Sequence, residues 1–314
     1  MIEQINKGQI FKENFPGLLR HINDPPDFLN YRGDIEKIPK DKNHKFLTIV
    51  GTRSPSAYGR EVCRYLIEGL KGLPITIVSG LAIGIDSLAH SYALENNLQT
   101  FAFPGSGLDD EIIYPRSRFN LANEIISSGG LLFSEYKNHE IATPWMFPQR
   151  NRLMAGISHL TVVIEAKEKS GSLITAKLAS DYARDVGAVP GPIFSELSKG
   201  PNLYLSICAN PIRSSEDILK LLDLDNFEIN TGIIEQKQNI DTSELFSTQT
   251  FNLSTDEEKI LNLLEIYSNR SEIVYSSGLP INVVSVSISS LILKRLIEEK
   301  NGVLHMTKFA KKHF

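Results

Sequence analysis

Short apolar segments alternate with amphipathic helical patterns through the centre of this 314-residue chain. Because most of the apolar segments are near-continuous runs, they are typical of strands buried on both faces of a sheet. Strand, loop and helix recur five times, and this order predicts a parallel α/β sheet. The predicted strands are Phe46–Val50, Thr76–Ser79, Thr100–Phe103, Leu131–Ser134, Leu160–Glu165 and Ala188–Pro190. The predicted helices are Arg60–Leu73, Asp86–Asn96, Arg118–Ser127, Leu173–Asp185 and Ser215–Leu222.

Composition and charge divide the chain into four segments. Residues 1–43 contain turn-forming residues and are predicted to be an extended lead-in, and residues 44–222 carry the α/β pattern. Residues 223–254 are acidic and amide-rich with few periodic apolar side chains, which predicts a linker. Residues 255–314 show a separate helical pattern and are predicted to form a small second domain.

The overall composition excludes several classes of protein. Hydrophobic residues make up 41% and charged residues 22%, which excludes a disordered chain, a collagen and a coiled coil. No apolar run approaches the ~20 residues of a membrane helix, and no signal peptide is visible. Because Cys63 and Cys208 stand far apart without a CxxC pair, we expect no disulfide scaffold and a reducing, cytoplasmic location.

The loops that follow the predicted strands are rich in glycine, serine and arginine. In open α/β sheets, ligands bind beyond the carboxyl ends of the strands, where these loops gather. Turn geometry alone explains one glycine-containing loop, but five on one edge indicate a phosphate-binding rim. The loops are Gly51–Gly59, Ser79–Asp86, Pro104–Gly107 with Tyr114–Arg116, Trp145–Arg152 and Ser170–Ser172.

Motifs of the common nucleotide-binding and hydrolytic enzymes are absent from the sequence. It contains no GxGxxG after the first strand, no P-loop, no GxSxG and no HExxH. Glu135 and Glu165 end strands and are interpreted as acceptors for loop N–H groups. Asp86 and His90 lie one helical turn apart and are interpreted as helix-start electrostatics and a satisfied histidine. No set of nucleophile, base and orienting group emerges, and we expect no metal or cofactor.

Aromatic residues lie beside the arginine-containing loops. Tyr114, Trp145 and Phe147 suit a single-stranded nucleic acid, whose bases stack on aromatic rings while its phosphates meet guanidinium groups. Packing among the loops is the alternative explanation for each of them.

The loop motifs together resemble the DNA-processing protein A (DprA/Smf) family. The segments that carry the resemblance, over residues 14–222, are VGTRSPSAYG (50–59), IVSGLAIGIDSLAH (77–90), PGSGLDDEIIYPR (104–116), FPQRNRLMAGIS (147–158) and EAKEKSGSLITA (165–176). The resemblance implies an extended Rossmann-like domain that binds single-stranded DNA without being an enzyme. It further implies a homodimer that protects incoming DNA and loads the RecA recombinase during natural transformation.

The resemblance also implies which residues contact DNA. Arg53 becomes the leading phosphate contact and Arg116 a further one, and the RNR motif adds Arg150, Asn151 and Arg152, beside the stacking or packing residue Phe147. Plausible backbone N–H donors are Gly51, Thr52, Ser79, Gly80, Gly105 and Gly107. The chain departs from the family in two places: about 40 residues before the first strand leave no room for a complete SAM-like domain, and Cys208 stands where a glycine is usual.

The C-terminal segment predicts a winged helix. Thr255 is the predicted N-cap of a first helix, and the apolar residues Val284, Ile288, Leu291, Ile292 and Leu296 fall at helical spacing later in the segment. Asn301-Gly302 predicts a hairpin turn. This resembles the small domain at the end of many DprA proteins. The exposed side of the longest helix offers serines 285, 287, 289 and 290, with Lys294 and Arg295 only at its end, so DNA and protein both remain candidate partners.

Three functions therefore follow from the sequence. The leading hypothesis is a non-enzymatic single-stranded DNA-binding protein. The alternative is an enzyme or sensor for a small phosphorylated nucleotide, which the same rim would suit. A pure protein adaptor is the third, and it would leave the arginine-rich loops unexplained.

Overall fold

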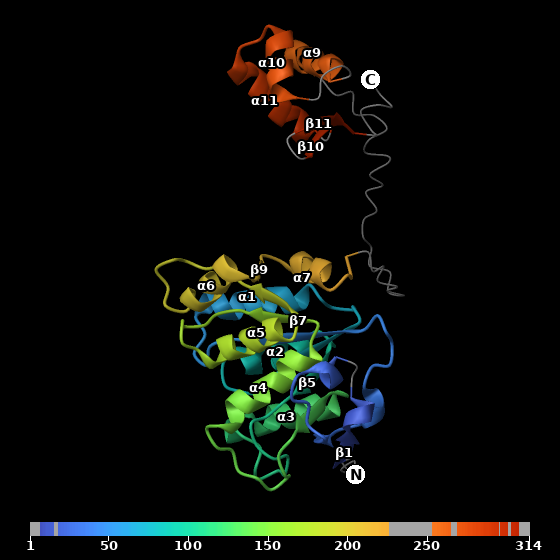
Figure 1. Ribbon diagram of the computed structural model, residues 1–314, viewed down its shortest axis with the longest axis vertical. Coiled ribbons are helices and arrows are strands. Elements are labelled where there is room, and N and C mark those ends of the chain that lie inside the picture. Colours follow the sequence, from blue (N-terminus) through green and yellow to red (C-terminus); the bar gives the residue numbers. More distant parts are fainter. Residues whose placement is uncertain are drawn as a thin grey trace. The chain divides into compact units, whose positions relative to one another are not determined.

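The computed structural model describes residues 7–15, 18–225, 253–264, 269–294, 296–300 and 303–307. The chain forms two compact units, Met1–Gly232 and Ile233–Phe314, both drawn in Figure 1. Most of the predicted acidic linker, residues 226–252, lies outside the described residues. Among the residues described, no helix is both long and apolar enough to cross a membrane.

A nine-stranded sheet forms the centre of the larger unit, as far as its residues are described, in the order β1-β2-β6-β5-β4-β3-β7-β8-β9. Neighbouring strands from β6 through β9 pair in parallel, which confirms the predicted parallel α/β fold. The strands are β1 (Lys7–Phe11), β2 (Phe28–Arg32), β3 (Lys45–Val50), β4 (Ile75–Ser79), β5 (Gln99–Ala102), β6 (Leu131–Ser134), β7 (Leu160–Val163), β8 (Asp185–Ala188) and β9 (Asn210–Pro211).

Helices cover both faces of this sheet (Figure 1). Strand β3 shows why: Phe46 and Val50 enter one hydrophobic core, while Leu47 and Ile49 enter the other. The face of Leu47 packs against α1 (Ala57–Glu68), α2 (Ile85–Glu95), α3 (Phe119–Ser127) and α7 (Ser215–Leu221). The face of Phe46 packs against α4 (Met146–Ile157), α5 (Gly171–Asp181) and α6 (Lys199–Ile207). Four short 3-10 helices complete the described unit: η1 (Lys12–Asn14), η2 (Leu19–His21), η3 (Ile35–Lys37) and η4 (Arg116–Arg118).

The lead-in adds two strands that the sequence did not predict. β1 pairs antiparallel with β2, and β2 pairs antiparallel with β6. Strand β2 escaped prediction because polar side chains occupy its buried positions. Asn30 donates from Nδ2 to the Tyr136 carbonyl at 2.7 Å, and Arg32, which is 1% exposed, lies 2.7 Å from Asp110 Oδ1. The buried polar groups are thus compensated by partners far along the chain.

The segment Trp145–Arg152, predicted to be a loop, belongs mostly to helix α4. Pro148 stands in the first turn, where its missing N–H removes no helical hydrogen bond. Residues 150–157 are all buried, so α4 has no polar stripe and shows no amphipathic periodicity. Helix α6 was missed for a related reason, because Gly200 and Pro201 occupy its first turn.

The other predicted elements form with shifted ends. The last predicted strand, Ala188–Pro190, is observed as β8 three residues earlier, at Asp185–Ala188. Its exposed Asp185 and its Gly187 interrupt the apolar run. A Cβ at Gly187 would lie 2.6 Å from Ile212 Cγ1, so the glycine allows a close approach between β8 and the segment after β9.

The smaller unit contains three described helices followed by a hairpin, the element order predicted for a winged helix. The elements are α9 (Thr255–Leu263), α10 (Arg270–Ser277), α11 (Ile281–Leu293), β10 (Ile297–Lys300) and β11 (Val303–Met306). Val284, Ile288, Leu291 and Leu296 are buried in its core as predicted, while Ile292 is only partly buried. The predicted turn Asn301-Gly302 and Arg295 lie outside the described residues.

Two details of this unit differ from prediction. The N-cap of α9 is Ser254 instead of Thr255, and it forms a reciprocal capping box with Glu257. Lys294 Nζ lies 2.7 and 2.8 Å from the two carboxylate oxygens of Glu257. This base at the end of α11 therefore forms an internal ion pair. Of the serines on α11, Ser285 and Ser289 are exposed and Ser287 is buried.

Candidate functional site

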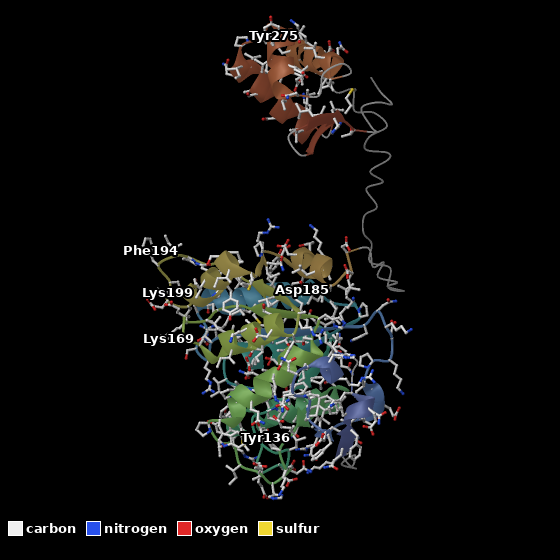
Figure 2. All side chains as sticks on the ribbon, viewed as in Figure 1. Tyr136, Lys169, Asp185, Phe194, Lys199 and Tyr275 are labelled. Carbon is white, nitrogen blue, oxygen red and sulfur yellow. The ribbon has the colours of Figure 1, made fainter. Side chains whose placement is uncertain are left out.

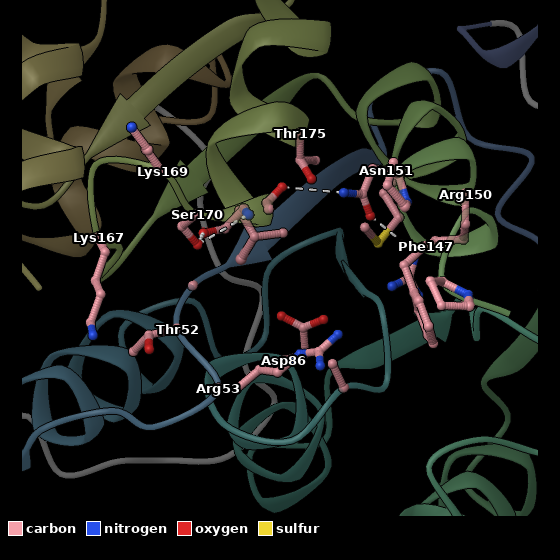
Figure 3. A pocket seen from close by; sticks show the side chains of 18 of the residues that line it. Thr52, Arg53, Asp86, Phe147, Arg150, Asn151, Lys167, Lys169, Ser170 and Thr175 are labelled. Atoms are coloured by element: carbon pink, nitrogen blue, oxygen red, sulfur yellow. Dashed lines mark hydrogen bonds between the residues drawn. The ribbon is translucent and has the colours of Figure 1, made fainter. Parts of the chain in front are cut away.

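The strand order reverses between β3 and β7. Strands β3 to β6 progress toward one edge of the sheet, and the chain then returns through α4 to place β7 on the other side of β3. Such a switch point leaves a crevice beyond the carboxyl ends of the two strands, and this is where open α/β sheets bind ligands. Residues after β3 and after β7 line one pocket of about 670 Å³ at this place. Figure 3 shows this pocket, which we call the switch-point pocket.

The loop after β3 is held by the end of β7. The Thr52 amide donates to the Glu165 carbonyl at 2.7 Å, and the Ser56 amide and hydroxyl donate to the Glu165 carboxylate at 2.9 and 2.6 Å. Ser56 in turn caps α1 by accepting a hydrogen bond from Gly59. Glu165 thus has the structural role that the sequence predicted, because its buried carboxylate accepts hydrogen bonds from the loop.

Three exposed cations line the switch-point pocket, and they come from the two loops. Arg53 follows β3, and Lys167 and Lys169 follow β7. The Arg53 guanidinium lies 5.6 Å from the centre of the Phe147 ring, which forms another wall of the pocket together with Tyr114. The pocket therefore joins positive charge to aromatic surface.

Helix α5 begins at the same pocket. Ser170 is its N-cap and accepts a hydrogen bond from the Ser172 amide, and Gly171 and Ser172 line the pocket. The N-terminus of a helix carries a partial positive charge that favours anions. One turn later, Thr175 is buried and also lines the pocket, and its Oγ1 has no hydrogen-bond partner within the described part of the chain. A bound molecule could supply that partner.

Arg150 lies on the floor of the pocket, but it is committed to the protein. Its Nη1 donates to the Gly80 carbonyl at 2.6 Å, and its Nε lies 3.2 Å from Asn151 Oδ1. Burial lowers the pKa of Arg150 to about 10, and the charge of Asp86 acts in the opposite direction. For Asp86, burial raises the pKa, while Arg150 and the amides of Ala82 and Gly80 lower it. The two buried charges offset each other electrostatically without a direct ion pair among the described contacts, and the hydrogen bond from Arg150 to the Gly80 carbonyl fixes the loop after β4. Both residues are labelled in Figure 3.

Gly80 separates the two members of this pair. A Cβ at this position would lie 2.6 Å from Arg150 Nη1 and 2.6 Å from Asp86 Oδ2. His90, the other half of the predicted Asp86–His90 pair, is buried with Nδ1 2.7 Å from Thr100 Oγ1, and burial lowers its pKa to about 3. The imidazole is therefore a neutral core group, as the sequence predicted.

The pocket brings together about half of the residues predicted to contact DNA. Those that line it are Gly51, Thr52, Arg53, Phe147, Arg150 and Asn151, and Gly80 lines an adjoining recess with Arg53 and Phe147. The Thr52 and Gly80 amides, predicted as free donors, are used by Glu165 and Asp86. Thr52 itself lies at the edge of the pocket (Figure 3), where its Oγ1 accepts a hydrogen bond from the Ser54 amide at 3.2 Å.

The other predicted contact residues do not line the switch-point pocket. Ser79 is buried and donates from Oγ to the Ile49 carbonyl at 2.6 Å. Gly105 packs under the Phe147 ring, and the Gly107 amide donates to the Glu140 carbonyl at 2.8 Å. Arg116 is exposed, donates to the Asp110 carbonyl and lies 4.4 Å from the Phe119 ring centre.

Arg152, the last residue of the RNR motif, points away from the pocket. It is 8% exposed, and its Nη2 lies 2.5 Å from Glu135 Oε2. Its Nε is 3.7 Å from Asp24 of the lead-in. The expectation that Arg152 contacts phosphate is therefore not supported by its position, because a helix turns successive residues to different sides. The interpretation of Glu135 as an acceptor for loop amides was wrong: its Oε2 pairs with Arg152, and its Oε1 has no hydrogen-bond partner in the described part of the chain.

Sequence reasoning missed Lys167, Lys169 and Thr175. The two lysines flank Glu168, so the segment has little net charge, yet both lysines line the switch-point pocket while Glu168 lines a different one. Alternation of charge along a turn was the signal that could have found them. Trp145, which the sequence grouped with Phe147, is 57% exposed and packs edge-on against Tyr136.

Comparison with known proteins identifies what this chain is similar to. The family described as DNA recombination-mediator protein A matches residues 8–223. The DNA processing protein DprA of Bacillus subtilis is 37% identical over 218 residues, which cover 69% of this chain and 71% of that protein. The crystal structure of DNA processing protein A from Streptococcus pneumoniae has a TM-score of 0.62 and 34% identity, over 69% of this chain and 74% of that one. The structure of DNA processing protein A from Helicobacter pylori, a protein described by its single-stranded DNA binding mode, has a TM-score of 0.62 and 28% identity, over 72% of this chain and 99% of that one.

Proposed function

The chain belongs to the DNA recombination-mediator protein A family, and from this premise we propose that it binds single-stranded DNA in the switch-point pocket. The observation that carries the proposal is the presence of Arg53, Lys167 and Lys169 around one pocket that Phe147 and Tyr114 also line. Positive groups that follow a backbone, combined with rings on which bases stack, are the common features of single-strand binding sites.

Each part of the pocket has a role in this proposal. Arg53 and the two lysines neutralise phosphates, and the first turn of α5 receives a further phosphate oxygen. Phe147 and Tyr114 offer their rings to bases. The unpartnered Thr175 hydroxyl provides a hydrogen bond to a group that reaches the floor.

The acids near the pocket favour binding over catalysis. Asp86 is the one acid among the described residues that line the pocket, and it is buried against Arg150. The Glu165 carboxylate accepts a hydrogen bond from the Ser56 hydroxyl, and the Glu135 carboxylate forms an ion pair with Arg152. A small phosphorylated ligand remains the competing proposal, and a large thermal stabilisation by one mononucleotide would favour it.

We further propose that the protein acts as a non-enzymatic mediator that protects single strands and loads the RecA recombinase in natural transformation. The family's description as a recombination mediator supports this step. A homodimer is proposed through the exposed apolar residues between β8 and β9. Ile193, Phe194 and Ile207 are 75%, 94% and 67% exposed, and Figure 2 shows Phe194 projecting from this edge.

The test is fluorescence anisotropy with labelled oligo-dT and with duplex of the same length. Three neutralised phosphates predict that log affinity falls with log salt with a slope of roughly −2, at about −0.7 per contact on a single strand. Arg53→Glu should abolish binding at moderate salt. Lys169→Ala should reduce the slope by about 0.7.

Lys71→Glu is the matched control. Lys71 is exposed and precedes β4, so it lies at the amino ends of the parallel strands, opposite the pocket. Its reversal makes the same charge change and should leave the affinity nearly unchanged. Binding that survives Arg53→Glu, or that Lys71→Glu weakens equally, would contradict the proposed site.

A further inference from the structure

A second groove opens on the other side of Arg53. It has a volume of about 510 Å³ and lies between the loop after β3, the start of α2 and the η4–α3 segment. Its cations are Arg53, Arg60 on α1 and Arg118 at the end of η4. Among the described residues that line it, Glu124 is the one acid. We call it the α2–α3 groove.

Arg53 connects this groove to the switch-point pocket. Its side chain lines both, and it also lines the small recess between them, together with Ile83, Tyr114 and Phe147. A polymer that contacts Arg53 therefore lies beside both cavities. A mononucleotide would have no need for the second cavity.

The two cavities differ in chemistry. Aromatic rings line the switch-point pocket, whereas the described lining of the α2–α3 groove contains no aromatic residue. The groove offers arginines and small polar side chains such as Ser91 and Asn120. Arg118 Nε is buried and has no hydrogen-bond partner in the described part of the chain. Guanidinium and hydroxyl groups without stacking surfaces suit a sugar-phosphate backbone more than bases.

We propose that the α2–α3 groove binds the phosphodiester backbone of the nucleotides that extend past Arg53 from the switch-point pocket. This inference rests on the proposed function and adds a second, base-independent section to the same DNA path. Short strands fill only the pocket. Longer strands also neutralise their phosphates on Arg118 and Arg60.

The experiment measures affinity against strand length. Oligo-dT strands from about 4 to about 16 nucleotides, the usual range of single-strand site sizes, are titrated at two salt concentrations. For long strands, Arg118→Ala should weaken binding about fivefold and reduce the salt slope by about 0.7, as expected for the loss of one phosphate contact. For the shortest strands that bind, Arg118→Ala should match the wild-type protein. Arg118→Lys should restore most of the slope, and Lys71→Ala serves as the charge-matched control.

The outcomes separate the groove from the pocket. Identical length dependence in the wild-type protein and Arg118→Ala would overturn the groove proposal and leave the pocket intact. Equal weakening for short and long strands would also overturn it, because Arg118 would then act on the pocket or on folding. A wild-type protein that binds no strand of any length would overturn the proposed function, and the groove proposal with it.

Discussion

Replacing Arg150 by methionine should unfold the larger unit at a much lower temperature, even though Arg150 belongs to a motif that suggests DNA contact. The side chain is 5% exposed, donates to the Gly80 carbonyl at 2.6 Å and compensates the buried Asp86. The variant removes the hydrogen bond to the buried Gly80 carbonyl and the positive charge that offsets the burial of Asp86, a loss of about 3 kcal/mol. For a unit of this size, each 1 kcal/mol corresponds to about 2–4 °C, so we expect a fall of about 6–12 °C.

The assay is thermal unfolding by circular dichroism near neutral pH, with Arg53→Met as the matched control. Arg53→Met makes the same chemical change in the same pocket, but on an exposed side chain, and should alter stability by no more than about 0.5 kcal/mol. On an Asp86→Asn background, the cost of Arg150→Met should shrink by about 1–3 kcal/mol, because the unpaired charge is gone.

The pH dependence of Arg150→Met follows from the same pair. Burial already raises the pKa of Asp86 in the folded protein, and removing Arg150 raises it further. An acid whose folded pKa exceeds its unfolded pKa gains a proton on folding, so it destabilises the folded state most at high pH. The deficit of the variant should therefore decrease as the pH falls from neutral to about 5. Equal unfolding temperatures of wild type and Arg150→Met would refute the structural role of Arg150. Arg150 would then again be a candidate phosphate contact.

Three further predictions test other parts of the molecule. A Cβ in Gly105→Ala would lie 2.5 Å from the Phe147 ring, so anisotropy should show single-strand binding weakened several-fold, and unchanged affinity would contradict the role of the ring. Burial opposes ionisation of Glu257, but hydrogen bonds from Lys294, Ser290 and the Ser254 amide lower its pKa to about 2. The ionised carboxylate therefore stabilises the folded smaller unit above about pH 4.5, and this stabilisation is lost as the pH falls toward 2. Lys294→Met should therefore lower the unfolding temperature of the smaller unit at neutral pH and have little effect near the acid end, and a pH-independent loss would argue against the ion pair. Phe194→Asp should shift a dimer to monomer in sedimentation velocity, and an unchanged oligomeric state would exclude that edge as the interface.

The regular part of the fold could be predicted because its residues obey one rule. Strands such as β3 are buried on both faces and therefore consist of near-continuous apolar runs. Strand β2 and helix α4 break the rule in opposite ways. Polar Asn30 and Arg32 are buried in β2 with partners far along the chain, and α4 is buried nearly all round, so neither shows a periodic pattern. Compensation by distant partners leaves no trace in a local sequence window.

The candidate site was predicted in its location but only partly in its residues. Loops at the carboxyl ends of strands meet by topology, so the position of Arg53 followed from the strand pattern. Exposure did not follow, because the local sequence does not reveal whether an arginine after a strand faces solvent, as Arg53 does, or is buried, as Arg150 is. Lys167 and Lys169 were missed although both are exposed. Because Glu168 stands between them, the net charge of this segment is small and gave no sign of a basic site.

The distribution of arginines over the site implies a division between positioning and binding. A buried guanidinium that already has an acid and a carbonyl as partners adds little to the attraction of a phosphate, because its charge is compensated. An exposed guanidinium or ammonium group is free to release its counter-ions when a strand arrives, and this release produces the salt dependence. Arg150 therefore holds the loop after β4 in place, and in the proposed binding mode Arg53, Lys167 and Lys169 provide the affinity. This division requires that a variant at Arg150 lowers the unfolding temperature, and that variants at Arg53, Lys167 or Lys169 reduce the salt dependence of DNA binding. A variant at Arg53 that lowered the unfolding temperature and also reduced the salt dependence would show that the two roles are not separable.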